Sequence, residues 1–505
     1  MTGALVTLPL VLPVAGALLC LFLPVRMRSG AGLVTSGAIL AAVLALARAT
    51  VVSGELTHPL GGWEAPLGIG LRVDGLACVF LLLNAFVGLP VGVYAAKYFT
   101  LPVGAKGEST LFWPLWLFLW AAMNGIYLSV DLFNLYVVIE VLGISAVALA
   151  ILSGRPAALI GGLRYLLAAL VGSMAYLLGV ALVYGSFGTL DLTLLGALVD
   201  TGFTTRLALG LMLTGLLVKT ALFPLHFWLP SAHAAADPPV SAILSGLVVK
   251  ASFYLILRLW VGVFDVTLTY AVGQAAGALG AVAVVWGSYQ ALRQKSLKLM
   301  VAHSTVGQVG YLFLLFPLIT VAYEGLGDSP WLVHAWTGGI YQALAHGFAK
   351  AAMFLAVGVF VLATGTDERD SIVNMVSHLP MTTFAFALAG VSLIGLPPSG
   401  GFVAKWMLLK AAFDSGQWWW APMVLWGSFL TAGYVFMILR VAFAPARGKR
   451  DKPLRRVPRV LEAAALALGI GAILIGFRAE EILMLIDVES PFADLVDPEE
   501  GGISP

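Results

Sequence analysis

Long apolar runs separated by short polar segments fill most of the chain. A helix needs about 20 mostly apolar residues to cross a bilayer. Fourteen runs reach roughly this length, at 4–24, 30–52, 74–96, 111–130, 132–153, 158–186, 206–228, 238–262, 270–292, 299–319, 333–363, 380–412, 418–444 and 460–477. The pattern predicts an all-α integral membrane protein with about 14 transmembrane helices. The runs at 333–363 and 380–412 exceed a straight span, so we expect tilt, a break or a re-entrant piece there.

Helix breakers interrupt the seventh and twelfth runs. Pro224 and Pro230 follow Lys219 in the seventh, and Gly395 and two prolines precede Lys405 in the twelfth. Proline removes a backbone donor, so both helices are expected to be broken within the membrane. Broken helices in corresponding halves of a chain are typical of an inverted repeat around an ion site.

The predicted organisation has four parts. Residues 1–110 form helices 1–3, and residues 445–505 form a basic loop, helix 14 and an acidic tail. Between them lie two five-helix repeats, at 111–262 and 270–444. An odd number of helices in each repeat gives the two repeats opposite orientations. The polar segment 188–204 is too short to span and predicts a short interfacial helix.

Composition excludes a soluble enzyme of this size. Hydrophobic residues make up 60% of the chain and charged ones 11%, with a mean hydropathy of +0.97, against about 25% charged residues in soluble domains. The net charge is +2 and no basic run is interleaved with aromatics, so no nucleic-acid partner is expected. Cys20 and Cys78 lie far apart in apolar runs, and no redox fingerprint is present. Neither a cofactor nor a metal is expected, and the first apolar run is interpreted as a retained helix rather than a signal peptide.

Basic residues predict the orientation in the cell membrane. If both termini lie outside, the basic loops around Arg26, Arg155, Arg293 and 447–459 all face the cytoplasm, and Lys97, Lys106, Lys295, Lys298 and Arg369 join them. The acidic tail then lies outside. An even number of spans puts both termini on the same face, which agrees with this arrangement.

Ionisable residues recur inside the predicted spans. They are Glu140, Lys219, His226, Lys250, His303, His346, Lys350 and Lys405. Such groups are costly in a membrane and mark ion pathways. Burial disfavours a charged lysine and a nearby carboxylate favours it, so lysines and histidines in series can relay protons. Ser304, Thr305, Gln308 and Tyr311 are suitable polar lining, and are equally consistent with interhelical hydrogen bonds.

Each group also has a structural interpretation. Glu140 is also consistent with an ion-pair partner for a neighbouring lysine, and His226 and His303 with satisfied core histidines. Lys410, Arg440, Arg164 and Arg258 are expected to extend to the membrane interface. Lys219, Lys250 and Lys405 lie too deep in apolar runs for that, which favours a functional role.

The motifs around these residues resemble the proton-translocating, antiporter-like subunits. This superfamily includes the A-type and D-type subunits of Mrp-type Na+/H+ antiporters, large membrane subunits of respiratory complex I and subunits of membrane-bound hydrogenases. The resemblance covers roughly residues 70–445, through DLFNLYVVIE, KTALFPLHFWLPSAHAAADPPVSAILSGLVVK, LKLMVAHSTVGQVGY, LAHGFAKAAMFL and GLPPSGGFVAK. Two residues depart from many relatives: His303 replaces a tyrosine, and Asp237 adds a carboxylate.

The resemblance implies roles for the series. Glu140 and Lys219 would form the gating ion pair. Lys250, His303, His346 and Lys350 would carry the central axis, and Lys405 would release the proton. It implies a protein that works with other membrane subunits in the lipid bilayer and moves protons, with Na+ left open.

Three functions remain open. The length and Lys405 favour a cation/proton antiporter subunit of the Mrp D type. A pump subunit of a complex I-like or hydrogenase-like enzyme is the second, with the redox step on partner proteins because this chain has no redox centre. The third is an ion-coupled partner for another transport process.

Overall fold

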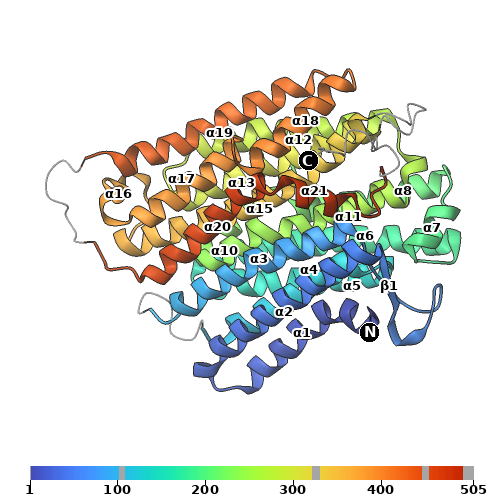
Figure 1. The fold of residues 1–505 in the computed structure, drawn as a ribbon, viewed down its shortest axis with the longest axis horizontal. Helices are drawn as coiled ribbons and strands as arrows, with labels where there is room; N and C mark the ends of the chain where they lie inside the picture. The colour runs from blue at the N-terminus through green and yellow to red at the C-terminus, as the bar shows by residue number, and fades with distance from the viewer. Residues whose placement is uncertain (1, 102–108, 321–329, 446–453, 493–505) are drawn as a thin grey trace.

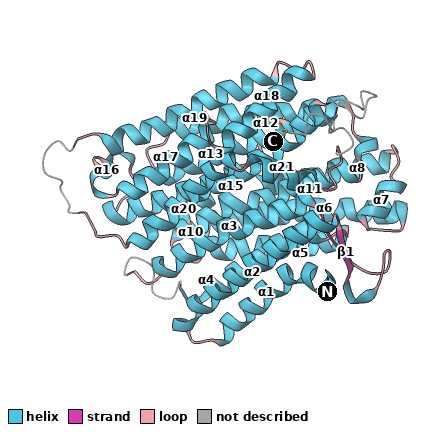
Figure 2. Cartoon of the chain, in the orientation of Figure 1, coloured by secondary structure: helices cyan, strands magenta, loops and turns pink. Residues whose placement is uncertain are grey.

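Helices lie side by side along one common direction in this protein (Figure 1). The structure, a computed structural model, describes residues 2–101, 109–320, 330–445 and 454–492. Within these ranges, helices make up almost all of the regular structure (Figure 2). The exception to the all-α prediction is a hairpin of β1 (Leu56–Pro59) and β2 (Gly70–Val73), in which Leu56 pairs with Val73.

Twelve helical segments of the described chain are long and apolar enough to cross a membrane. They are α1 (Thr2–Phe22), α2 (Val25–Ser53), α3 (Gly75–Tyr98), α4 (Ser109–Leu128), α5 (Leu132–Ala150), α6 (Pro156–Phe187), the continuous stretch α10 (Pro238–Ile243), η2 (Leu244–Val248) and α11 (Val249–Gly262), α12 (Tyr270–Arg293), the stretch α13 (Leu297–Phe313) and α14 (Leu315–Thr320), α15 (Trp331–Thr364), α19 (Trp420–Phe443) and α20 (Arg459–Phe477). The chain is therefore a multi-pass membrane protein. The sequence predicted 14 spans, and the two missing from the twelve are the two that were expected to be broken.

Both interruptions lie where the breakers predicted them. The run 206–228 forms α8 (Phe203–Thr220), which ends at Ala221 with a φ of 58°, and a turn segment that leads into α9 (Leu229–Ala235). The run 380–412 forms α17 (Pro380–Ile394), which ends at Gly395 with a φ of 86°, and α18 (Gly400–Asp414). A residue in the left-handed region with a proline shortly after it stops a helix. Each piece is then too short or too polar to span by itself.

The long run at 333–363 behaves differently. It forms one uninterrupted helix of 34 residues, α15, which packs against α3, α13, α17, α18 and α20. At 1.5 Å per residue this helix is about 51 Å long, more than the roughly 30 Å of a hydrocarbon core. Its excess length is accommodated without a break.

Short elements complete the fold. The predicted interfacial helix is α7 (Leu192–Leu198), and α21 (Ala479–Asp487), which the sequence did not indicate, packs on α3. The others are α16 (Met375–His378) and the 3-10 turns η1 (Leu60–Gly62), η3 (Asp265–Thr267) and η5 (Arg369–Ile372). Parts of two predicted charged segments, 446–453 and 493–505, and Lys106, lie outside the described residues.

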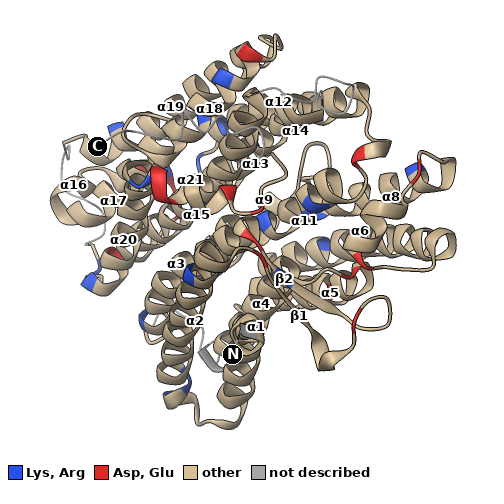
Figure 3. Cartoon of the chain, turned by 45° about the vertical axis from the view of Figure 1, so that its right-hand side comes forward, with Lys and Arg blue, Asp and Glu red and all other residues tan. Residues whose placement is uncertain are grey.

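Charged residues gather at the ends of the helices and in the loops, and a few lie within the bundle (Figure 3). Arg258, expected to extend to the membrane interface, is only 14% exposed and pairs with a carboxylate. Its guanidinium donates to Asp74, the residue that precedes α3, and its Nε donates to the Tyr254 hydroxyl at 2.9 Å. The partner lies 184 residues away in the chain, so no local pattern could indicate it.

This ion pair changes the acidity of Asp74. Burial by itself would raise the pKa of Asp74, but the Arg258 guanidinium and a hydrogen bond from the Ala77 N–H lower the pKa below its ordinary value. The carboxylate also caps α3 through that N–H, at 2.9 Å. Asp74 therefore joins α3 to α11.

We expect Asp74→Asn to destabilise the protein at neutral pH by about 3–5 kcal/mol, because Arg258 would be left as a buried charge without its partner. The pKa of Asp74 is lower in the folded protein than in the unfolded chain, where it is about 3.9. The ionised carboxylate therefore stabilises the fold above this unfolded pKa, and the contribution is lost as the pH falls through the folded pKa. The difference in melting midpoint between wild type and variant, measured in detergent, should thus be constant from about pH 8 to pH 5 and shrink only below about pH 4. Equal midpoints at pH 7 would contradict the assignment.

Glycines bring α6 and α8 into close contact. A Cβ at Gly215 would lie 2.2 Å from the carbonyl oxygen of Gly172, and a Cβ at Gly172 would lie 2.8 Å from the carbonyl oxygen of Gly215. Small residues at such crossings let membrane helices pack backbone to backbone. This contact holds α8, and with it Lys219, against α6.

Gly215→Ala is expected to destabilise the fold by about 1–3 kcal/mol through overpacking. Gly210 on the same helix has open space around its Cα, so Gly210→Ala serves as the matched control and should be neutral. Thermal unfolding followed by size-exclusion chromatography compares the two. Similar midpoints for both variants would show that the crossing is not close-packed.

Candidate functional site

Glu140 and Lys219 lie opposite one another on α5 and α8. The Lys219 Nζ is 4.0 Å from the Glu140 Oε1, and the two side chains are 21% (Glu140) and 5% (Lys219) exposed. The ammonium lies over Gly143, where an added Cβ would be 3.5 Å away. The structure thus brings together the two residues that the sequence predicted as an ion pair.

The end of α8 places Lys219 in its last turn. The Trp228 Nε1 donates to the Val218 carbonyl at 2.8 Å, and its ring stacks on Tyr165 with centroids 4.1 Å apart. The same carbonyl accepts from the Ala221 N–H at 3.1 Å, so the indole adds a second donor at the end of α8. Lys219 is therefore fixed directly beside the break.

Lys250 lies at an irregularity of the next span. Its Nζ donates to the Ser245 carbonyl, within the π-helical turn η2. The Ser245 Oγ lies 2.8 Å from the Thr305 Oγ1 of α13, which links the two helices. π-turns leave carbonyls available and are frequent at functional sites.

Lys350 and His346 lie on one face of α15, four residues apart. The Lys350 Nζ donates to the Ser304 Oγ and to the Val301 carbonyl, the latter at 3.3 Å. His346 is completely buried, and neither ring nitrogen has a hydrogen-bond partner among the described residues. Buried polar atoms are nearly always satisfied, so an unpartnered imidazole at this depth indicates contact with water.

Glutamines continue the polar series. The Gln342 Nε2, four residues before His346, donates to the Gln308 Oε1 at 3.1 Å, and the Gln308 Nε2 donates to the Thr431 Oγ1 at 3.2 Å. All three side chains are buried. They lie between helices α13, α15 and α19 and lead toward Tyr311.

Lys405 folds back onto the end of α17. Its Nζ donates to the Leu393 and Ile394 carbonyls at 2.8 and 3.1 Å and to the Ser428 Oγ at 2.9 Å. It also lies 4.3 Å from the centre of the Tyr311 ring, in a cation–π contact. The negative end of the half-helix dipole favours its charge. Lys405 is 4% exposed, and no salt bridge to it is present in the part of the chain that the structure describes.

His226 and His303 stand apart from this series. They lie close enough for their charges to interact, and the His226 ring packs on Phe223 at 5.4 Å. Both are only partly buried. The structure brings the two predicted histidines together, at the side of the bundle rather than among the buried lysines.

Sequence reasoning missed two residues of the series. His233 on α9 is completely buried, and its charge would interact with those of Lys250, Lys350 and Lys298. Lys298, predicted as a loop charge, is instead buried and donates to the Ala236 carbonyl at 2.6 Å. The second histidine of the segment FPLHFWLPSAHAAADPP was the available signal for His233.

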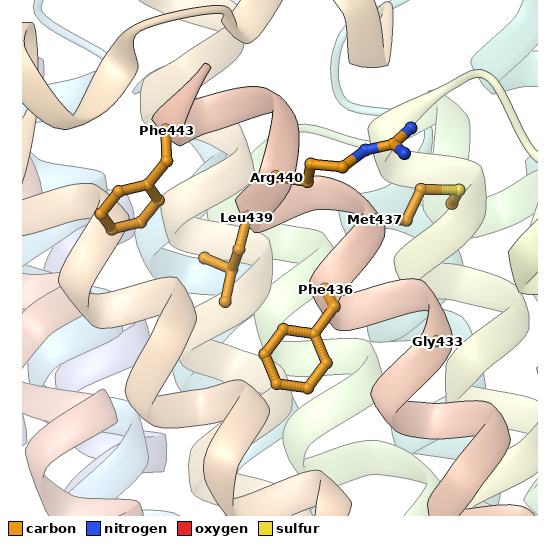
Figure 4. Close-up of a pocket in the computed structure, with 6 residues that line it drawn as sticks. All are labelled: Gly433, Phe436, Met437, Leu439, Arg440 and Phe443. Atoms are coloured by element: carbon orange, nitrogen blue, oxygen red, sulfur yellow. The ribbon is translucent and has the colours of Figure 1, made fainter. Parts of the chain in front are cut away.

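The residues expected at the interface are exposed, apart from Arg258. They are Arg164, Lys410 and Arg440. Arg440 borders a groove of about 620 Å³ along α19 that Gly433, Phe436, Met437, Leu439 and Phe443 also line (Figure 4). None of the buried ionisable groups lines this groove, so Arg440 lies apart from the series.

The arrangement can hold and pass protons. Buried amines, an imidazole, hydroxyls and amides lie on α8, α11, α13, α15 and α18, between the helices that carry Glu140 and Lys405. Among the described residues no group of three or more His, Cys, Asp or Glu side chains could hold a metal ion.

Known proteins are similar to this chain in sequence and in architecture. The chain is 33% identical to the N-type subunit of the NADH-quinone oxidoreductase of Desulforudis audaxviator over 95% of its length and 96% of the relative's. It is 28% identical to the D-type subunit of the Na(+)/H(+) antiporter of Bacillus subtilis over 98% of both chains. A chain in the structure of the Mrp complex from Dietzia sp. DQ12-45-1b superposes with a TM-score of 0.86 at 25% identity, covering 97% of this chain and 99% of that one.

Part of the chain also matches a known protein family. Residues 129–431, from the start of α5 to the middle of α19, match the transmembrane family of NADH:quinone oxidoreductases and Mrp antiporters. This range contains Glu140 and Lys405 and everything between them. The chain belongs to the NADH:quinone oxidoreductase/Mrp antiporter transmembrane family.

Proposed function

We propose that this antiporter-like membrane subunit translocates protons in a multisubunit cation/proton antiporter, in the position of the Mrp D-type subunit. The observation that carries the proposal is the Glu140–Lys219 pair at 4.0 Å, followed by buried amines that lead to Lys405. The likeness to the D-type antiporter subunit of Bacillus subtilis over 98% of both chains supports this position.

In the proposed cycle the ion pair is the gate. While Lys219 faces Glu140, its ammonium is stabilised and holds its proton; when the pair separates, the buried amine releases it. The proton then passes through Lys250, His346 and Lys350 to Lys405. The Glu140 side chain is 21% exposed, which leaves room for the movement.

The proposal includes two five-helix repeats of opposite orientation, at 111–262 and 270–444. The broken helices α8/α9 and α17/α18 take the fourth position of each repeat and support this division. It also includes an orientation with both termini outside, in which Arg155, Arg293, Arg369 and Arg455 lie on the inner face.

A second function has its own support. The 33% identity to the N-type subunit of the NADH-quinone oxidoreductase favours a proton pump driven by electron transfer in partner proteins. Purification of the native complex in mild detergent, with mass spectrometry of its subunits and an optical spectrum, distinguishes the two. Small hydrophobic partners without a chromophore support the antiporter; soluble partners with iron–sulfur absorption support the redox complex.

We expect Glu140→Ala and Lys219→Ala each to reduce proton translocation at least about tenfold, because the charge switch needs both partners. Translocation is measured in vesicles from a strain that lacks the native chain. The assembled complex should keep its subunit composition on native gels. Normal transport by either variant would overturn the gate assignment.

Lys405→Ala should block translocation, because it removes the amine at the end of the series. Lys410→Ala, five residues on and exposed, is the matched control and should keep most of the activity. The same vesicle assay compares them. Equal losses would mean that the position of Lys405 on the end of α17 has no special role.

A further inference from the structure

A polar cavity of about 310 Å³ lies beside the beginning of α10. Its charged and hydroxyl-bearing walls are Tyr98, Ser153, Arg155, Asp237, Lys298 and Arg455. These residues come from helix ends and loops that the proposed orientation places on the inner face. The cavity is therefore a water-accessible recess at the end of the bundle, separate from the Glu140–Lys219 pair.

Asp237 is the carboxylate in this wall. It precedes α10 but makes no capping hydrogen bond, and it is 5% exposed. Its Oδ1 accepts from the Tyr98 hydroxyl and from the Arg155 Nη2, both at 3.2 Å. Its Oδ2 is buried and has no hydrogen-bond partner in the described chain. An unsatisfied carboxylate oxygen beside a cavity requires a water or a proton.

The Ser153 Oγ is also unpartnered among the described residues and lines the same cavity. Two unsatisfied oxygens and ample room meet the conditions for bound water. The cavity can thus deliver protons to the Asp237 Oδ2.

Lys298 connects the cavity with the buried series. It lines the cavity, and its charge interacts with that of Asp237. The charges of Lys298, Lys250 and Lys350 in turn act on His233. The Lys298 Nζ also donates to the Ala236 carbonyl, which lies between Asp237 and α9, the helix that carries His233.

We propose that Asp237 is the proton-loading group of the inner face, and this inference rests on the proposed function. A hydronium ion in the cavity transfers its proton to Oδ2, an O–H bond forms, and water remains. Transfer of that proton to a water on the Lys298 side breaks the O–H bond and regenerates the carboxylate. Arg155 stabilises the ionised form between cycles.

Several charged and hydroxyl-bearing groups face this carboxylate. They are Tyr94 and Tyr98 of α3, Arg155 of the α5–α6 loop, Lys298 of α13 and Arg455 before α20.

The test is Asp237→Asn in the complete complex, assayed in inside-out vesicles for the initial rate of proton translocation. We expect at least a tenfold fall with unchanged subunit composition, and recovery of most of the rate in Asp237→Glu, for which the cavity has room. Asp370→Asn is the matched control: that carboxylate also accepts from an arginine at 3.2 Å, but it is 78% exposed. Its rate should equal that of the wild type.

If Asp237 and Arg155 formed only a structural ion pair, the variants would show a different pattern of rates. Arg155→Gln removes the pair but keeps the carboxylate, so under our proposal it retains transport and shifts the dependence of the rate on inner pH. Equal losses in Arg155→Gln and Asp237→Asn with an unchanged pH profile would overturn the proposal, as would a wild-type rate in Asp237→Asn. If Glu140→Ala also transports normally, the proposed function fails; if it is inactive while Asp237→Asn is normal, only the loading group fails.

Discussion

Backbone carbonyls that no helix satisfies are the constraint on which this structure depends. A carbonyl without a donor is costly in hydrocarbon, so an interrupted helix needs a partner at each break. Here buried lysines supply it: Lys405 at the end of α17, Lys250 at the π-turn and Lys298 beyond α9. The same contact stabilises an amine that would otherwise be too costly to bury. Irregular backbone and buried cation thus depend on each other.

Lys219 differs from Lys250 and Lys405 because its nearby partner is a carboxylate. A backbone dipole stays in place when an amine gains or loses a proton, whereas a carboxylate on another helix can move away. The lysine amines that donate to backbone carbonyls are suited to carry charge along a fixed path. The amine opposite Glu140 is suited to respond to movement between α5 and α8.

Local chemistry made much of this architecture predictable. Prolines and glycines act on their own helix, so breaks near Pro224 and near Gly395 could be predicted from the sequence, whereas the left-handed Ala221 that ends α8 could not. Partners distant in the chain could not. In the sequence, Arg258 lies near a helix end as an interfacial residue would, and only the folded bundle brings Asp74 to it. Lys298 follows a loop in the sequence, and only the packing of α9 on α13 buries it. Twelve of the fourteen predicted spans are single stretches long and apolar enough to cross a membrane, and the other two are the broken ones.

The spacing of Gln342, His346 and Lys350 limits how the chain can change over evolution. Steps of four keep the three side chains on one face of α15, and the helix is continuous over 34 residues. One inserted or deleted residue would rotate everything beyond it by about 100°. It would turn the polar groups away from α13 and present apolar ones in their place. This stretch can therefore accept substitutions but not a change of length.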